Sequence, residues 1–172
     1  MRPSDSEIAR RIRAAITNNI ASHGLHIQHV MGSENSPRFS YTIGMTNIDA
    51  PELIVFGLPP EAVHGPIMEY FNQLRMCHRP KDGCMIQDLW SVTMLLEAVD
   101  NDEAAPHTVQ ADAYFEDMGK QPTYKQMLWP DQNGKFPHQR GFNPDYRPSQ
   151  PYIGKRHPRL DDDYGAEYFS LH

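Results

Sequence analysis

Small polar residues alternate along one short segment, in the pattern of a strand face that can hold a ligand. Residues 39–45 alternate between large apolar side chains and the smaller Ser40, Thr42 and Gly44. Successive side chains of a strand point to opposite faces, so these three residues share one face. Two hydroxyl groups beside a glycine leave that face open for a flat ligand and can hydrogen-bond to it. An ordinary solvated strand face explains the pattern equally well.

Two ionisable residues follow at the entries of the next predicted elements. Glu52 opens an apolar run directly after Pro51, and His64 falls one turn into a segment with helical spacing. A carboxylate at a strand end can act as an acid, a base or a ligand anchor, and a helix entry favours an anion. The structural alternatives, which we favour, are a Glu52 that pairs with an arginine such as Arg38 or caps backbone N–H groups, and a His64 on the helix surface.

An aromatic residue precedes a predicted turn. Trp129 comes just before the sequence Asp-Gln-Asn-Gly, and Asn-Gly is typical of a hairpin turn. The hairpin would pair a strand at residues 124–129 with one at 135–137. Trp129 could stack on a ligand ring as a lid, or anchor a dimer. Local packing of the hairpin onto the sheet is the default interpretation.

Histidine and cysteine spacing does not complete a metal site. His23, His26 and His29 are three residues apart, so a strand would send them to different faces. Cys77 and Cys84, with the histidine after Cys77, form only half of a zinc site. No nucleophile, phosphate-loop or dinucleotide motif is present. The sequence therefore assigns no metal and no catalytic residue, and it does not decide whether the protein is an enzyme.

Periodicity predicts the elements that position these residues. Isoleucines recur every fourth residue between a Ser4–Glu7 capping box and Gly24, which predicts a first helix. A second helix should run from Pro59-Pro60 to about Cys77, and Pro66 within its first turns is an alternative start. A short helix is predicted at 108–117. Further strands are predicted at residues 25–31, 39–45, 52–58 and 92–99.

These elements predict an α+β fold. We expect a curved, mainly antiparallel sheet or split barrel with two main helices and an extended C-terminal arm. Residues 1–141 would form a single α+β domain. Repeated prolines make residues 142–172 an extended arm, which would wrap the domain or a partner.

Composition narrows the setting of the protein. The chain has 172 residues, 39% of them hydrophobic, which is enough for one packed domain. Its net charge of −6 argues against general nucleic-acid binding, because such binding needs positive charge to neutralise phosphates. The low number of cysteines and the lack of an apolar leader predict a cytoplasmic protein. The apolar runs are too short to predict a membrane segment.

Several blocks of residues together resemble a known bacterial and phage family, domain of unknown function 4262. The similarity covers about residues 23–154, and the blocks that carry it are residues 39–45, 51–58, 128–131, 134–137 and 150–151. Two positions depart from the family pattern, since Leu25 and His138 stand where aromatic residues are common. If those aromatic residues lined a site, the site is altered here. A looser, architectural analogy is to flavin-reductase-like split barrels, which by itself does not establish function.

Three functions are compatible with these residues. The leading hypothesis is a module that binds a small phosphorylated ring compound, with a flavin or a nucleotide as the candidate cofactor. Its site would lie at Ser40, Thr42, Gly44, Glu52 and His64, with Trp129 as a lid. The second is a protein-interaction or phage–host conflict factor, or a homodimer, that uses the aromatic hairpin and the arm. The third is a hydrolase that uses Glu52 and His64.

Overall fold

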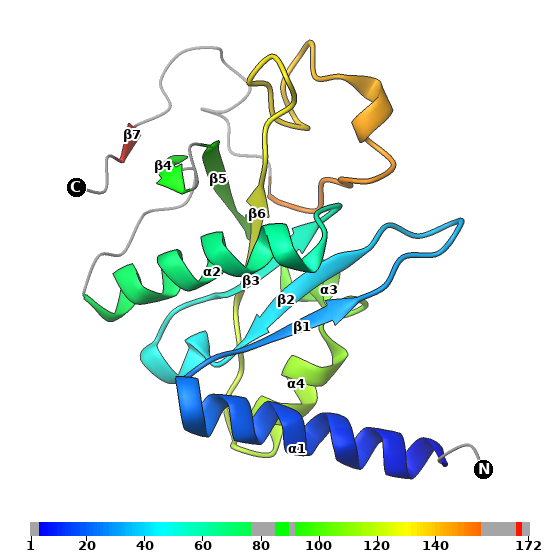
Figure 1. The fold of residues 1–172 in the computed structure, drawn as a ribbon, viewed down its shortest axis with the longest axis vertical. Helices are drawn as coiled ribbons and strands as arrows, with labels where there is room; N and C mark the ends of the chain where they lie inside the picture. Colours follow the sequence, from blue (N-terminus) through cyan, green and yellow to red (C-terminus); the bar gives the residue numbers. More distant parts are fainter. Residues whose placement is uncertain (1–3, 77–84, 90–91, 156–167, 170–172) are drawn as a thin grey trace.

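The computed structural model describes residues 4–76, 85–89, 92–155 and 168–169. Within these ranges, helices cover both faces of one mixed β-sheet, which confirms the predicted α+β class (Figure 1). The strand order is β1-β2-β3-β6-β5-β4-β7, an open order that does not close into a barrel. The strands are His26–Val30 (β1), Phe39–Ile43 (β2), Glu52–Phe56 (β3), Met85–Leu89 (β4), Val92–Val99 (β5), Tyr124–Leu128 (β6) and Tyr168–Phe169 (β7).

Strand pairing is mainly antiparallel, as predicted, but one central pairing is parallel. The first three strands form an antiparallel meander. β6 then joins β3 in parallel, with Glu52 opposite Tyr124, and its other edge pairs antiparallel with β5. All five residues of β3 are buried, as its continuous apolar run predicted for a central strand. β4 was not predicted.

Helices cover the two faces unequally. α2 packs on one face, and α1 with α4 packs on the other (Figure 1). The α-helices span Asp5–His23 (α1), Pro60–Arg75 (α2), Asn101–Ala104 (α3) and Val109–Glu116 (α4), and the 3-10 turns span Met45–Ile48 (η1) and Pro144–Tyr146 (η2). α2 begins at Pro60 and continues through Pro66, so this proline does not shift the helix start. The residues from Cys77 to Cys84 lie outside the described ranges.

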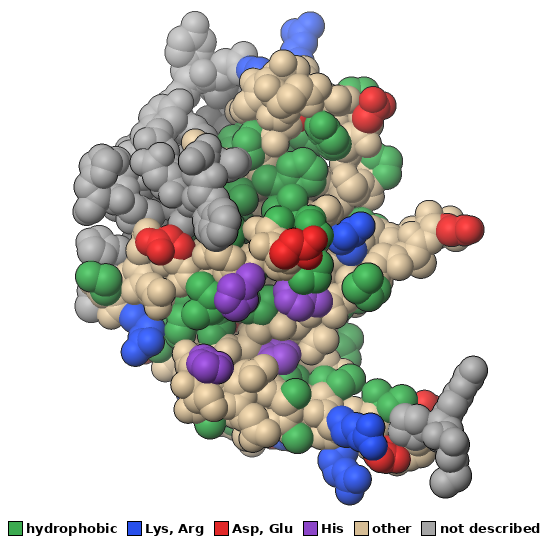
Figure 2. Space-filling view, viewed as in Figure 1, with side chains coloured by type: hydrophobic (Ala, Val, Ile, Leu, Met, Phe, Trp, Pro, Cys, Tyr) green, Lys and Arg blue, Asp and Glu red, His purple; other side chains and the backbone are tan. Residues whose placement is uncertain are grey.

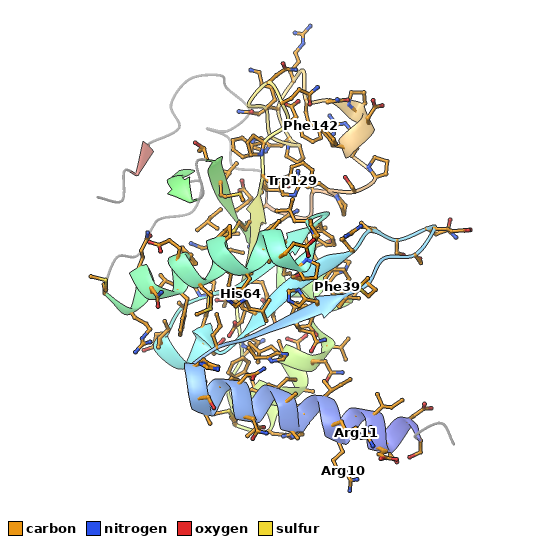
Figure 3. All side chains as sticks on the ribbon, viewed as in Figure 1. Arg10, Arg11, Phe39, His64, Trp129 and Phe142 are labelled. Atoms are coloured by element: carbon orange, nitrogen blue, oxygen red, sulfur yellow. The ribbon has the colours of Figure 1, made fainter. Side chains whose placement is uncertain are left out.

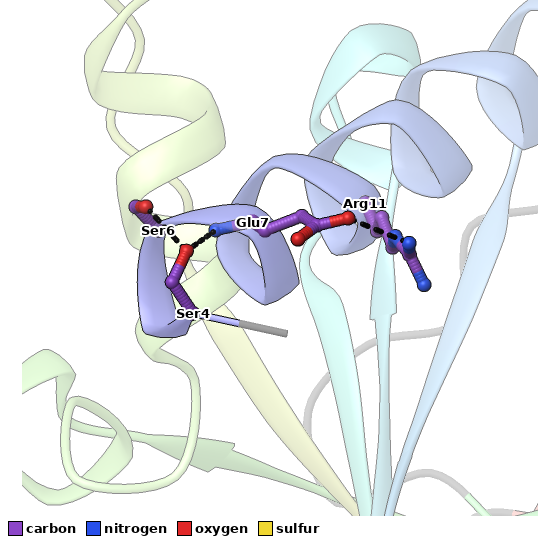
Figure 4. A network of polar contacts seen from close by, with 4 residues as sticks. All are labelled: Ser4, Ser6, Glu7 and Arg11. Atoms are coloured by element: carbon purple, nitrogen blue, oxygen red, sulfur yellow. Dashed lines mark hydrogen bonds and ion pairs between the residues drawn. The ribbon is translucent and has the colours of Figure 1, made fainter. Parts of the chain in front are cut away.

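α1 shows its predicted caps with one difference. The Ser4 hydroxyl accepts a hydrogen bond from the backbone N–H of Glu7, and Gly24 ends the helix with a φ of 80°. The Glu7 carboxylate does not complete the capping box, because it accepts a 2.6 Å hydrogen bond from Arg11 (Figure 4). Most of the isoleucine stripe packs on the core, with Ile16 1% exposed and Ile12 and Ile20 partly buried beside it, whereas Ile8 is 43% exposed.

The predicted hairpin after β6 is wrong, since no strand forms at residues 135–137. The Asp131 carboxylate instead accepts backbone hydrogen bonds from Asn133, Lys135 and Asn143, at 2.8, 2.9 and 2.8 Å. These bonds fold residues 129–149 into an irregular unit, which we call the upper lobe (Figure 1). The Asn-Gly turn is present, but backbone N–H groups after it bond to the Asp131 side chain and not to a partner strand.

The first residues after the upper lobe run along the sheet. Gln126 of β6 donates a hydrogen bond to the carbonyl of Pro151 and accepts one from the N–H of Ile153, at 2.7 and 2.9 Å. The N–H of Lys155 then bonds to the carbonyl of Ala98 in β5. The described part of the arm therefore packs on its own sheet. The division of the chain at residue 141 stays a prediction.

Candidate functional site

Thr42 and Glu52 form a buried polar cluster where β2 meets β3. The Thr42 hydroxyl donates to Glu52 Oε2 at 2.6 Å. Glu52 Oε1 accepts from the backbone N–H groups of Gly44 and Thr46 and from the Thr46 hydroxyl, at 3.1, 2.8 and 2.7 Å. Both Thr42 and Glu52 are 0% exposed. Four donors thus surround the carboxylate, as a buried charge requires.

The surroundings of Glu52 match one of its two structural alternatives. Its carboxylate caps the start of η1 through the N–H groups of Gly44 and Thr46, and it does not pair with Arg38. The hydroxyl group of Thr42 is also fully used within the chain, because its oxygen accepts a 2.8 Å hydrogen bond from the N–H of Leu53. The cluster joins two strands and a turn.

The strand face of Ser40 and Thr42 is not open, which corrects the sequence-based expectation. Ser40 is 1% exposed, and Val55 beside it on β3 packs into the core under α2. Gly44 serves a close backbone approach, because a Cβ there would lie 2.6 Å from the carbonyl oxygen of Gly24. The φ of 136° at Gly44 also favours glycine. Small residues at this place allow tight packing.

Histidines gather at the edge of this face (Figure 2). His29 of β1 lies with Nδ1 2.7 Å from the Ser40 hydroxyl and is half-buried. Burial lowers the pKa of His29, and the neighbouring His26 and His64 lower it further. His64 is exposed on α2 (Figure 3). The structure therefore brings Ser40, His29 and His64 to one side of the sheet.

Trp129 lies where β6 enters the upper lobe (Figure 3). Its indole N–H donates to the carbonyl of Phe56 at 2.8 Å. Gln150 binds both backbone groups of Trp129, accepting from its N–H and donating to its carbonyl, each at 3.0 Å. The ring is 3.1 Å from the place of a Cβ on Gly57. Trp129 is thus a fixed wall beside Gly57, and these bonds give no support to the predicted lid.

A cavity beside this wall contains a residue that the sequence did not assign to the site. It has a volume of about 360 Å³ and is lined by residues of the 31–38 loop together with Gly57 and Ser149. We call it the Arg38 cavity, because Arg38 is the one charged residue among its described lining residues. The N–H of Gly57 bonds to the Arg38 carbonyl at 2.9 Å, so the backbone of Arg38 lies beside Gly57, which is two residues before Pro59, the N-cap of α2.

The Arg38 side chain is exposed and forms no hydrogen bond or ion pair with any residue in the described part of the chain. The sequence suggested Arg38 only as an ion-pair partner for Glu52. Its neighbours in the cavity, Gly57 and Ser149, are far away in the sequence. Local patterns therefore contain no signal for this cavity.

The described residues contain neither a metal-binding cluster nor a membrane-spanning helix. No group of three or more His, Cys, Asp or Glu residues there is arranged to hold a metal ion. The half zinc site at Cys77 and Cys84 lies outside these ranges. No described helix combines the length and the apolar character that a membrane span needs.

Comparison with known proteins identifies a family and nothing closer. No curated protein and no solved structure matches the chain. A family model described as Domain of unknown function (DUF4262) matches residues 19–143. This range contains the blocks 39–45, 51–58 and 128–137 that suggested the resemblance, whereas residues 150–151 fall beyond it. Since the match covers well over half of the sequence, the chain belongs to the DUF4262 family.

Proposed function

We propose that this protein is a binding module for a small phosphorylated ring compound, such as a nucleotide or a flavin, and that the phosphate binds in the Arg38 cavity. The observation that carries the proposal is the Arg38 guanidinium, a cation in a cavity without a described partner. A guanidinium has a planar set of N–H donors that matches phosphate oxygens in pairs.

The size and walls of the cavity suit such a ligand. Its volume of about 360 Å³ lies in the range of small-molecule pockets. Met31 and Pro37 supply apolar surface for a ring, and Trp129 stands behind Gly57. Trp129 does not line the cavity itself, but hydrogen bonds to Phe56 and Gln150 hold it in place behind the lining residue Gly57.

The entry of α2 supports an anion at the same end. The first turn of a helix carries partial positive charge, although here the N–H groups of Ala62 and Val63 already bond to the Pro59 carbonyl. Gly57 lines the cavity and is followed closely by Pro59, so this turn begins beside it. Glu61 in the first turn opposes an anion, because its carboxylate is exposed at the same helix end. The net effect of the turn is therefore modest, and Arg38 remains the main attraction.

The proposal shifts the site from the residues that the sequence suggested. Thr42, Gly44 and Glu52 have their hydrogen-bonding groups occupied within the chain. They support β2 and β3, which in turn position Arg38 and Gly57. His64 remains near the helix entry and adds positive charge when protonated.

The two other hypotheses have less support. An interaction surface on the upper lobe would need exposed aromatic residues, yet Phe136 and Phe142 are each 4% exposed. A hydrolase that uses Glu52 as a base would need a carboxylate oxygen open to substrate, and both oxygens accept hydrogen bonds from within the chain. Neither alternative has an observation that favours it over ligand binding.

The test is calorimetric titration of the full chain with inorganic phosphate, flavin mononucleotide and adenosine monophosphate. Arg38→Ala should weaken binding about tenfold, the effect of one hydrogen-bonded charge. Arg140→Ala is the matched control, because Arg140 is exposed and does not line the cavity. Glu61→Gln should strengthen binding, since it removes a negative charge from the helix entry.

Two outcomes would refute the proposal. One is the absence of binding of all three compounds at millimolar concentration. The other is equal affinity in the parent and in Arg38→Ala, which would place any binding elsewhere. The absorbance and mass spectra of molecules released from the purified protein would separately show whether a flavin or a nucleotide accompanies it.

A further inference from the structure

A second cavity lies on the opposite face of the sheet, between α1 and α4. Its volume is about 350 Å³. Ala9, Arg10 and Arg13 line it from α1, and Ala113 and Tyr114 line it from α4. Ile16, at 1% exposure, forms its floor. We call this cavity the α1–α4 groove.

The groove is open because small side chains stand on both of its walls. Ala9 and Ala113 are both exposed, and neither fills the space between the helices. The same two helices carry further exposed apolar side chains: Ile8 on α1 is 43% exposed, Val109 on α4 is 60% exposed, and Met118 just after α4 is 47% exposed. Exposed apolar side chains are common at binding sites.

The charged residues of the groove have one sign. Among the described residues that line it, Arg10 and Arg13 are the charged ones. Arg13 pairs with Asp117 after α4, whereas Arg10 forms no hydrogen bond or ion pair with a residue in the described ranges. Nearby carboxylates are occupied: Glu7 pairs with Arg11, and Asp112 accepts hydrogen bonds from Tyr124 and Thr108. A cation therefore stands beside apolar surface, in a chain whose net charge is −6.

We infer that the α1–α4 groove is a second binding site, which takes a small organic anion with one apolar ring system. The ring packs between Ala9 and Ala113 on the floor of Ile16. Its carboxylate or sulfonate group binds Arg10, whose side chain extends from α1 toward solvent (Figure 3). The site is independent of the Arg38 cavity, and its α1 wall precedes the family-matched range, which begins at residue 19.

The experiment titrates the full chain with 1-naphthoate and monitors binding by the amide chemical shifts. Neutral 1-naphthalenemethanol, which lacks the carboxylate, is the comparison compound. We expect saturable shifts in α1 and α4 with naphthoate. Arg10→Ala should weaken naphthoate about fivefold, the upper range for an exposed ion pair. Arg11→Ala is the matched control on the same helix, since Arg11 pairs with Glu7 and does not line the groove (Figure 4).

Two further variants locate the bound probe. Ala113→Leu fills the groove from an exposed position, so the variant should fold and lose the binding. Arg38→Ala should leave naphthoate binding unchanged, which separates this site from the first. The inference is overturned if naphthoate fails to saturate at millimolar concentration, or if Ala113→Leu melts like the parent and still binds the probe.

Discussion

The hydroxyl group of Thr42 donates a 2.6 Å hydrogen bond to the Glu52 carboxylate, and neither side chain is exposed to solvent. The same hydroxyl oxygen accepts the N–H of Leu53. Two residues that the sequence suggested for ligand binding thus hold β2 and β3 together.

Thr42→Val tests this structural role. The variant keeps nearly the same volume but removes two hydrogen bonds, one of them to a buried charge. We expect the free energy of unfolding to fall by about 3 kcal/mol in urea denaturation. Thr42→Ser keeps the hydroxyl group and should cost much less. If Thr42→Val unfolds like the parent, the cluster does not stabilise the fold.

The isoleucine stripe of α1 should contribute to stability at its buried positions and not at Ile8. Ile16→Ala removes a fully buried side chain and should lower the free energy of unfolding by about 3 kcal/mol. Ile8→Ala is its matched control on the same stripe, and it should change stability by less than about 0.5 kcal/mol. Equal losses in the two variants would contradict the observed position of α1.

Gly57 should resist substitution more than a glycine with the same backbone conformation elsewhere. Gly57 and Gly134 have φ angles of 81° and 74°, so alanine at either position costs about 1 kcal/mol in backbone strain. At Gly57 the new Cβ would also lie 2.6 Å from the carbonyl oxygen of Ser149, whereas Gly134 has open space. We therefore expect Gly57→Ala to cost at least about 1 kcal/mol more. Thermal melts of the two variants make the comparison, and similar melting temperatures would argue against this close approach.

Asp131 should make the stability of the upper lobe dependent on pH. Burial alone would raise the pKa of Asp131, but the backbone hydrogen bonds from Lys135, Asn143 and Asn133, with the charge of Lys135, outweigh burial and lower it. A lowered pKa in the folded state means that the carboxylate stabilises the fold above its unfolded pKa of about 3.9. That contribution disappears as the pH falls through the lower, folded value.

Asp131→Asn should therefore melt at a lower temperature than the parent at neutral pH, and the difference should shrink in acid. The measurement is the melting temperature of both proteins from neutral pH down into acid, below the unfolded pKa of the carboxyl group. Asp145→Asn, an exposed change in the same lobe, controls for surface charge. A difference that stays constant across this range would rule out the carboxylate as its source.

Elements with a local signature could be predicted from the sequence. Ser4 and Gly24 bracket α1, and β5 spans Val92–Val99 as its apolar run indicated. The fully buried β3 also follows from its composition. In each case the relevant interactions join residues within a few positions of one another, or depend only on how apolar a short segment is. The same local patterns suggested Thr42 and Glu52 as candidate site residues but did not predict that they bond to each other.

Long-range contacts decided the rest. The parallel pairing of β3 with β6 joins Glu52 to Tyr124, and no local pattern specifies which distant strand fills that edge. The hairpin prediction failed because Asp131 bonds to Asn143, twelve residues away, and removes the need for a partner strand. The face of Ser40 looked open because polarity alone does not reveal a covering helix. Arg38 became a candidate only when Gly57 and Ser149 closed a cavity beside it, since a cavity exists only between segments that the fold has brought together.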